Sequence, residues 1–244
     1  MVDVCVKRTP PGFEFALKLY QKFTHPNLVT DKSPVSAGDV AAFKRGIEPL
    51  AAGDRLGPLL AQFPASFRAT PEARAYLDWL LTTFRDYRVA VELRHRSWSD
   101  QAANVFELLQ GFGAAWTQID EPKFRSSIRQ DHRPNVKGFY YMRLHGRNAQ
   151  QWWKHERSED RYNYLYSEAE LRPIAEAVQT ARALVKKQYV YLNTHFAAQA
   201  VADATVLRQL LDEPVTAPMP AELVSRYPML EGKVTILPPS RLLE

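Results

Sequence analysis

The feature that most constrains the fold is an alternation of short apolar runs with longer helical patterns, which continues to about residue 212. The runs are rich in aromatic, branched or other apolar residues, as buried strands are. They lie at Phe13–Leu19, Leu59–Phe63, Arg88–Leu93, Gly113–Ile119, Gly138–Leu144 and Tyr189–Leu192. We therefore expect six strands.

Helices are predicted between the strands, because each of these segments has a helix-start signal. A Ser or Thr side-chain oxygen can accept from the unpaired amides of the first turn, and a nearby acid suits the positive end of the helix dipole. The predicted starts are Ser36 with Asp39, Thr70 with Pro71 and Glu72, Ser99 with Asp100, and Ser167 with Glu170. These helices run to about Ala52, Arg85, Gly111 and Lys187, and a last helix covers Phe196–Leu211.

This alternation implies parallel strands joined by crossover helices, and hence an α/β protein with either a doubly wound open sheet or a barrel. A chain of 244 residues fits a single barrel domain. No linker or repeat divides it, so residues 1–211 are predicted to form one domain. Residues 212–244 hold six prolines and are predicted to be an extended surface segment.

Composition limits the class of protein further. A 45% hydrophobic content excludes a disordered chain. The single cysteine, Cys5, excludes an internal disulfide framework and a cysteine-based zinc ribbon. There is no signal peptide and no apolar run near the roughly 18 residues that a membrane helix needs. We expect a cytoplasmic protein with no membrane partner.

The formal net charge of +5 is too small to identify a partner, but its distribution is uneven. Between Lys123 and Arg147, seven basic residues stand against one acid, Asp131, which gives +6. Aromatic residues follow at Trp152, Trp153, Tyr162, Tyr164 and Tyr166. The basic segment and these rings favour, as an alternative function, nucleic-acid binding with nuclease-like chemistry.

Polar residues stand where each predicted strand ends, and the carboxyl ends of parallel strands converge on the face that binds ligands. Side chains two positions apart on a strand point the same way. The predicted substrate-binding residues are Lys18, His25, Gln62, Arg94, His95, Trp98, Arg143, Arg147 and Asn193, and the predicted catalytic residues are Glu92, His145 and His195; Asp120 follows the fourth strand.

The residue types suggest roles for this set. Arginine forks match phosphate and carboxylate geometry, so Arg94, Arg143 and Arg147 are candidate anchors for an anion. Carboxyl and imidazole groups suit acid–base chemistry near neutral pH. Two alternatives stay open: ion pairs that only close the rim of the sheet, and a divalent metal held by Glu92 and the histidines. Trp98 fits a core position better than a lid.

Sequence motifs identify no cofactor. No GxxxxGK[ST] or GxGxxG loop is present, which argues against nucleotide-triphosphate hydrolysis and dinucleotide binding. No GxSxG elbow or HExxH motif is present either. The sequence names no substrate and does not define the oligomeric state.

At these same residues the chain resembles the YecE-like family, domain of unknown function 72. The resemblance rests on FEFALK at Phe13–Lys18 with Thr24–His25, LGPLLAQFP at Leu56–Pro64, VELRHRSW at Val91–Trp98, YYMRLHGR at Tyr140–Arg147, RYNYLYSEAEL at Arg161–Leu171 and YVYLNTHF at Tyr189–Phe196. It implies a TIM-type β/α barrel. The family carries no established activity that could be transferred.

Two departures from the family pattern bear on the barrel. The family's usual first strand, with a Gly-Ser/Thr-Gly-Trp-like segment, and its second strand, with a Glu-Ile-Asn-like motif, do not precede Phe13. The resemblance thus predicts an N-terminally truncated barrel with about six strands and the first two missing. Thr194 and Ala197–Ala198 stand where the family more often has a second Asn and a Gly.

Three hypotheses follow. The first is an enzyme, a hydrolase or lyase, that binds a small anionic or phosphorylated substrate through Arg143 and Arg94, with Glu92 and His145 exchanging protons. The second is the nucleic-acid binder described above. The third is a truncated barrel without function.

Overall fold

The computed structural model describes residues 2–25, 33–153, 156–157 and 159–237. The described helices are α1 (Val2–Lys7), α2 (Gln21–Thr24), α3 (Ala37–Ala52), α4 (Pro71–Thr83), α5 (Arg96–Ser99), α6 (Ala102–Gly111), α7 (Glu168–Arg182), α8 (Gln199–Leu210) and α9 (Ala221–Arg226). The strands are β1 (Phe15–Lys18), β2 (Leu56–Gln62), β3 (Val89–Glu92), β4 (Ala115–Trp116), β5 (Gln118–Asp120), β6 (Tyr140–Leu144) and β7 (Gln188–Leu192).

The chain divides into two compact units. Unit 1 comprises residues up to Thr117 together with Arg125–Tyr141, and unit 2 comprises Gln118–Phe124 together with the chain from Met142 onwards. Each unit has its own sheet, in the order β1-β2-β3-β4 for the first and β5-β6-β7 for the second. The prediction of one domain over residues 1–211 stays a prediction.

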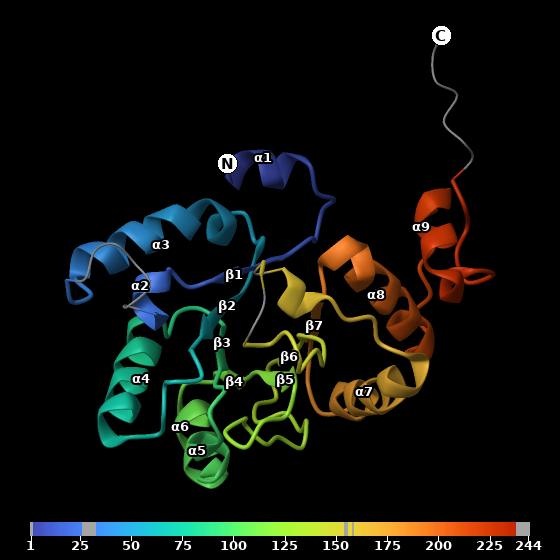
Figure 1. Ribbon diagram of the computed structural model, residues 1–244. Coiled ribbons are helices and arrows are strands. Elements are labelled where there is room, and N and C mark those ends of the chain that lie inside the picture. Colours follow the sequence, from blue (N-terminus) through green and yellow to red (C-terminus); the bar gives the residue numbers. More distant parts are fainter. Residues whose placement is uncertain (1, 26–32, 154–155, 158, 238–244) are drawn as a thin grey trace. The chain divides into compact units, whose positions relative to one another are not determined.

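Unit 1 contains a parallel sheet flanked by helices. β1 pairs with β2, β2 with β3 and β3 with β4, all in parallel. Every residue of β3 is buried, as is typical of a parallel sheet covered by helices. Phe23, Phe43 and Phe84 meet edge to face in its core, with ring centroids 5.5–5.7 Å apart. Figure 1 shows α3, α4, α5 and α6 around this sheet.

Unit 2 is built from three strands and the helix pair α7 and α8. β5 pairs with β6 in parallel, and β7 is the other neighbour of β6. All five residues of β6 are buried. α7 begins with the capping box predicted at Ser167 and Glu170, and it packs against α8, as Figure 1 shows.

The α/β class with parallel sheets is confirmed. Capping boxes or caps form at Ser36, Thr70 and Ser167 as predicted. No closed barrel is found among the described residues, and the TIM-type barrel stays a prediction. None of the described helices is long and apolar enough to cross a membrane.

The described residues form seven strands, one more than the six predicted. The strand predicted over Gly113–Ile119 is divided into β4 and β5, which belong to different sheets. The division falls at Thr117, whose amide donates to the carbonyl of Val91 in β3 at 2.9 Å. From Gln118 onwards the backbone pairs with β6 instead. A single apolar run carries no sign of this change of hydrogen-bonding partner.

The helix predicted from Ser99 is also corrected, because the chain forms α5 and α6 with a break between them. The Ser99 hydroxyl does not cap a helix; it donates to the carbonyl of Arg96 at 2.9 Å and accepts from the amide of Arg129 at 3.1 Å. α6 follows Gln101, which makes no side-chain cap. The serine is used for tertiary contacts, which its local sequence does not reveal.

Two further helix boundaries differ from the expectation. α7 ends at Arg182, five residues before Lys187, because the chain must turn before β7 begins at Gln188. The segment after Leu211 is not wholly extended, since it forms α9 and a 3-10 turn at Pro228–Leu230. Val224 and Leu230 are buried there, so apolar burial outweighs the proline content.

The predicted last helix begins with a strained turn. Residues Phe196–Ala198 form a 3-10 turn, and Ala197 and Ala198 have φ values of 47° and 66° before α8 starts. A left-handed conformation brings Cβ too close to the following carbonyl oxygen, and glycine alone escapes this cost. This is the position at which the family resemblance led us to expect glycine.

We predict that Ala198→Gly stabilises the protein by about 1 kcal/mol, because it removes the left-handed penalty. The matched control is Ala204→Gly inside α8, which we expect to destabilise by about 1 kcal/mol through lost helix propensity. Urea unfolding measures both. A loss of stability in Ala198→Gly as large as in Ala204→Gly would contradict the prediction.

Candidate functional site

Unit 1 brings part of the predicted site together at the ends of β1, β2 and β3. The carboxylate of Glu92 is fully buried and pairs with Arg94, whose Nε and Nη2 lie 2.8 and 2.7 Å from the same Oε1. Gln62 stands beside Glu92 in the register of the sheet. The two side chains form an ion pair although β3 ends at Glu92, so Arg94 reaches the carboxylate from beyond the strand.

The charges of this ion pair affect the pKa of His25. Burial lowers the pKa of the His25 imidazole, and the positive charges of Arg94 and Lys18 lower it further, while Glu92 acts in the opposite direction. The ring Nδ1 is 2.9 Å from the hydroxyl of Thr24. A neutral imidazole is therefore favoured at neutral pH, which suits a hydrogen-bonding or base role.

His95 and Trp98 have structural positions instead. Nδ1 of His95 accepts from the amide of Ser97 at 3.1 Å and so caps α5. Trp98 is fully buried; its indole donates to the carbonyl of Phe67 at 2.8 Å and stacks on the Phe67 ring. The core position that the sequence favoured for Trp98 is the one the structure shows, and it leaves no surface for a ligand.

Unit 2 brings together the residues at the ends of β6 and β7. Arg143 is 4% exposed and His145 has no exposed surface. Asn193 contacts both: Nη2 of Arg143 donates to its Oδ1 at 3.5 Å, and its Nδ2 lies 3.4 Å from Nδ1 of His145. The amide of Asn193 also donates to the carbonyl of Leu144 at 2.7 Å, which places it beside β6. We call these three residues the strand-end cluster.

The cluster defines the proton positions on its histidine. An arginine side chain can only donate hydrogen bonds, so the atom of Asn193 that faces Arg143 must be the acceptor Oδ1. The NH2 group of the same amide therefore faces His145. Nδ1 of a neutral His145 therefore accepts, and the ring hydrogen is on Nε2. The cluster thus offers a guanidinium and an Nε2–H donor.

A second histidine and two aromatic rings lie beside the cluster. His195 is exposed, and its Nδ1 lies 3.1 Å from the carbonyl of Asn193, so a neutral His195 keeps its hydrogen on Nδ1 and a lone pair on Nε2. The Tyr162 ring is 5.1 Å from the His195 ring. The ring centroids of Trp152 and Tyr162 lie 6.5 and 6.4 Å from that of His145. Two of the aromatic residues noted in the sequence thus border the cluster.

Arg147 is occupied by acids, which argues against its predicted role as an anchor. Its Nε and Nη2 both lie 2.9 Å from carboxylate oxygens of Asp120, and its Nη1 lies 3.3 Å from Glu170. The Tyr166 hydroxyl donates to Asp120 at 2.6 Å. The pKa of Arg147 is raised, first by its hydrogen bonds with Asp120. An added anion would have to compete with two carboxylates.

Gly146 lets the chain leave β6 close to the following loop. Its φ is +79°, and an added Cβ would lie 2.6 Å from Cβ of Tyr164, closer than side-chain carbons approach. The amide of Gly146 donates to the Tyr166 hydroxyl at 2.9 Å. Glycine is required here for both conformation and space.

Asp203 is a buried carboxyl that the sequence reasoning missed. Its oxygens accept from the amide of Tyr166 at 3.1 Å and from the hydroxyl of Thr194 at 3.2 Å. Burial raises its pKa from 3.8 to about 7, against the opposing effect of these hydrogen bonds. The available signal was an acid on the apolar face of α8, beside Ala202 and Val206.

The basic residues of the segment Lys123–Arg147 have different surroundings. Arg133 pairs with Asp131, Arg147 pairs with Asp120, and Arg143 is buried. The other four basic residues, Lys123, Arg125, Arg129 and Lys137, are exposed. Nucleic-acid binding stays a prediction. The part of the chain that the structure describes holds no group of three or more His, Cys, Asp or Glu residues that could bind a metal ion, so we name no metal ligands.

These observations define a parallel α/β protein with polar clusters at its strand ends. The sequence pattern of the family described as "Protein of unknown function DUF72" matches residues 1–224, and the chain belongs to this family. The resemblance stated from the sequence is thereby confirmed, since the YecE-like and DUF72 names denote one family.

Similar proteins agree with this assignment. The UPF0759 protein YunF of Bacillus subtilis (strain 168) is 27% identical over 225 residues, which are 89% of this chain and 80% of YunF. The crystal structure of a DUF72 family protein from Thermotoga maritima MSB8 is 34% identical with a TM-score of 0.77, over 87% of this chain and 78% of that one. One from Enterococcus faecalis V583 is 25% identical with a TM-score of 0.78, over 86% and 78%.

We predict that Asp203 makes stability fall as the pH rises from about 4 to about 7. Its folded pKa of about 7 lies above the ordinary value of 3.8, so the folded state holds the proton more tightly and loses that advantage as the pH increases. The slope from this group reaches about 1.4 kcal/mol per pH unit at most. Denaturant unfolding of the protein and of Asp203→Asn across this range measures the difference. An identical pH dependence in both would contradict the prediction.

Proposed function

We propose that the chain is an enzyme that binds a small phosphorylated substrate at the strand-end cluster of unit 2. The observation that supports this most is the bridging of buried Arg143 and buried His145 by Asn193. The three side chains come from the carboxyl ends of neighbouring strands, where parallel α/β proteins bind ligands. They combine an anion-binding group with a hydrogen-bond donor.

Arg143 would hold the anion. A guanidinium fork matches the oxygens of a phosphate, and its attraction for an anion is stronger in a buried, low-dielectric site than at the surface. Asn193 contacts the same guanidinium through Oδ1 and so orients it. The other predicted anchor in this unit, Arg147, is held by Asp120 and Glu170 and is left out of the proposal.

Two histidines serve the proposed reaction. The Nε2–H of neutral His145 can donate a hydrogen bond to the leaving oxygen of a phosphate ester, and the Nε2 lone pair of exposed His195 can accept a proton from water or substrate. The leaving oxygen then takes its proton from the His195 imidazolium or from water. His145 has no exposed surface, so a substrate reaches its ring when Trp152 or Tyr162 is displaced. Hydrolysis or elimination of a phosphate ester is the reaction class that uses these groups.

The ion pair of unit 1 keeps its predicted role as a separate proposal. Glu92 would exchange a proton with the substrate, and Arg94 would bind an anion. Glu92 and Arg94 also form an ion pair, so each side chain compensates the buried charge of the other. Glu92→Gln and Arg94→Gln test these roles by the same measurements.

We predict that a phosphate-bearing ligand raises the melting temperature of the protein and that Arg143→Gln abolishes this rise. Inorganic phosphate, sugar phosphates and nucleotides form the panel. A ligand at a hundredfold excess over its Kd stabilises the native state by about 2.7 kcal/mol, which shifts a cooperative transition measurably. Arg143→Lys keeps the charge but loses the fork, so it should retain part of the shift.

Arg172→Gln is the matched control, because Arg172 is an exposed arginine of α7 that pairs with Glu168 at the surface. Release of inorganic phosphate from each ligand that binds then measures turnover, which His145→Gln should lower without loss of the thermal shift. A cooperative melt that no ligand of the panel shifts would overturn the proposal. A shift that survives in Arg143→Gln would move the site elsewhere.

A further inference from the structure

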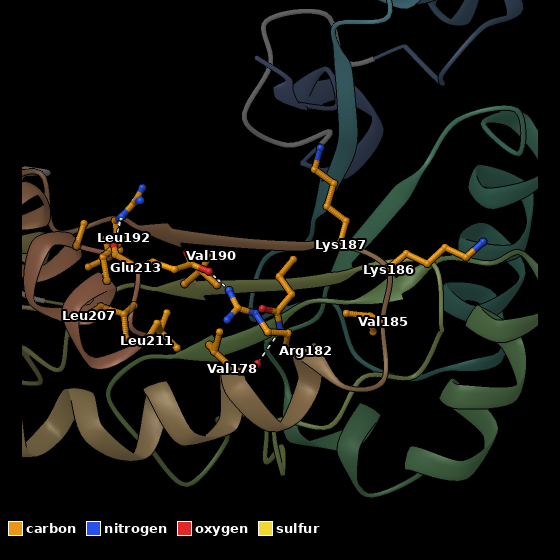
Figure 2. A pocket seen from close by; sticks show the side chains of 13 residues that line it. Val178, Arg182, Val185, Lys186, Lys187, Val190, Leu192, Leu207, Leu211 and Glu213 are labelled. Carbon is orange, nitrogen blue, oxygen red and sulfur yellow. Dashed lines mark hydrogen bonds and ion pairs between the residues drawn. The ribbon is translucent and has the colours of Figure 1, made fainter. Parts of the chain in front are cut away.

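A cavity of about 440 Å³ lies in unit 2 between α7, α8 and β7. None of the residues that line it belongs to the strand-end cluster; the lining extends from Val185, before β7, along the strand to Leu192. Its volume is within the range of cavities that bind small molecules. Figure 2 shows the side chains that line it.

The floor of the cavity is aliphatic. It is formed by side chains of α7, β7 and α8 and of the residues that follow the two helices, namely Val178, Val185, Val190, Leu192, Ala204, Leu207 and Leu211. No aromatic ring is among the described residues that line it. Such a surface favours a flexible hydrocarbon chain, because burial of apolar area is the main gain and no ring is present for stacking.

The strand beneath the cavity is unusually accessible. Val190 and Leu192 are half-buried, whereas every residue of the neighbouring strand β6 is buried. A parallel strand covered by helices normally loses both faces to the core. The pair α7 and α8 therefore leaves aliphatic surface of β7 open to a ligand.

The rim of the cavity is strongly basic. Arg182, Lys186, Lys187 and Arg208 stand against one acid, Glu213, so the lining has a formal charge of +3, four minus one. Glu213 spans the rim: its carboxylate pairs with Arg182, and its backbone carbonyl accepts from Nε of Arg208 at 2.8 Å. In Figure 2 Lys186 and Lys187 extend away from the floor on long, flexible stems.

We propose that this cavity binds an anionic amphiphile with a single saturated chain, a fatty-acid carboxylate or an alkyl phosphate. The chain would cover Val190 and Leu192 on the floor, and the head group would lie at the basic rim near Arg208. The apolar floor and the rim of charge +3 together favour this class of ligand. A neutral alcohol would gain only apolar burial on the floor, and a short anion would gain only electrostatic attraction at the rim.

Isothermal titration of the full chain tests the proposal with decanoate, decyl phosphate, decanol, decyltrimethylammonium and acetate, all below micelle-forming concentrations. We expect decanoate or decyl phosphate to bind at least about tenfold more tightly than decanol, and acetate and the cation not to bind. The ratio between decanoate and decyl phosphate identifies the preferred head group. Equal binding of decanoate and decanol, or no binding of either anion, would overturn the proposal.

Two variants locate the binding. Ala204 is half-buried on the floor, so Ala204→Leu fills the cavity and should weaken decanoate binding at least about tenfold. Arg208→Gln should weaken the anions but leave decanol unchanged, with Arg172→Gln, outside the cavity, as the matched control. Unchanged binding in both cavity variants would place the ligand elsewhere and refute the assignment. Self-association of the protein that Ala204→Leu abolishes, without ligand binding, would assign the cavity to a second copy of the chain and also refute it.

Discussion

The buried carboxylate of Asp120 is the interaction on which the geometry of unit 2 depends. It is 6% exposed, and a charge at that depth persists only with strong partners, which here are Arg147 and the Tyr166 hydroxyl. Its backbone carbonyl accepts from the amide of His145 at 2.8 Å. One residue of β5 thus fixes the end of β6, and with it the imidazole ring that we propose as a hydrogen-bond donor to the substrate.

Two arginines near the end of β6 have different partners and are therefore assigned different roles. Arg147 forms ion pairs with Asp120 and Glu170, so its charge has a structural role. Arg143, four positions earlier, meets the amide oxygen of Asn193. An amide oxygen that accepts from a guanidinium orients it, and this is the contact that the proposed anion site uses.

Much of the fold followed from local signals. Capping boxes at Ser36 and Ser167 form as predicted, because they depend on residues three positions apart. The signals failed where a residue serves a distant partner: Ser99 bonds with Arg129 instead of capping a helix, and Asp203 accepts from the amide of Tyr166.

The sequence by itself determined the parallel α/β class, most of the strands and the set of polar residues at their ends, because periodicity, capping and alternation are properties of neighbouring residues. Only the tertiary structure decided that the fourth apolar run contributes strands to two sheets and that Arg147 forms ion pairs with acids. Each of these outcomes depends on which distant group satisfies a hydrogen bond or a charge, and no local pattern encodes that choice.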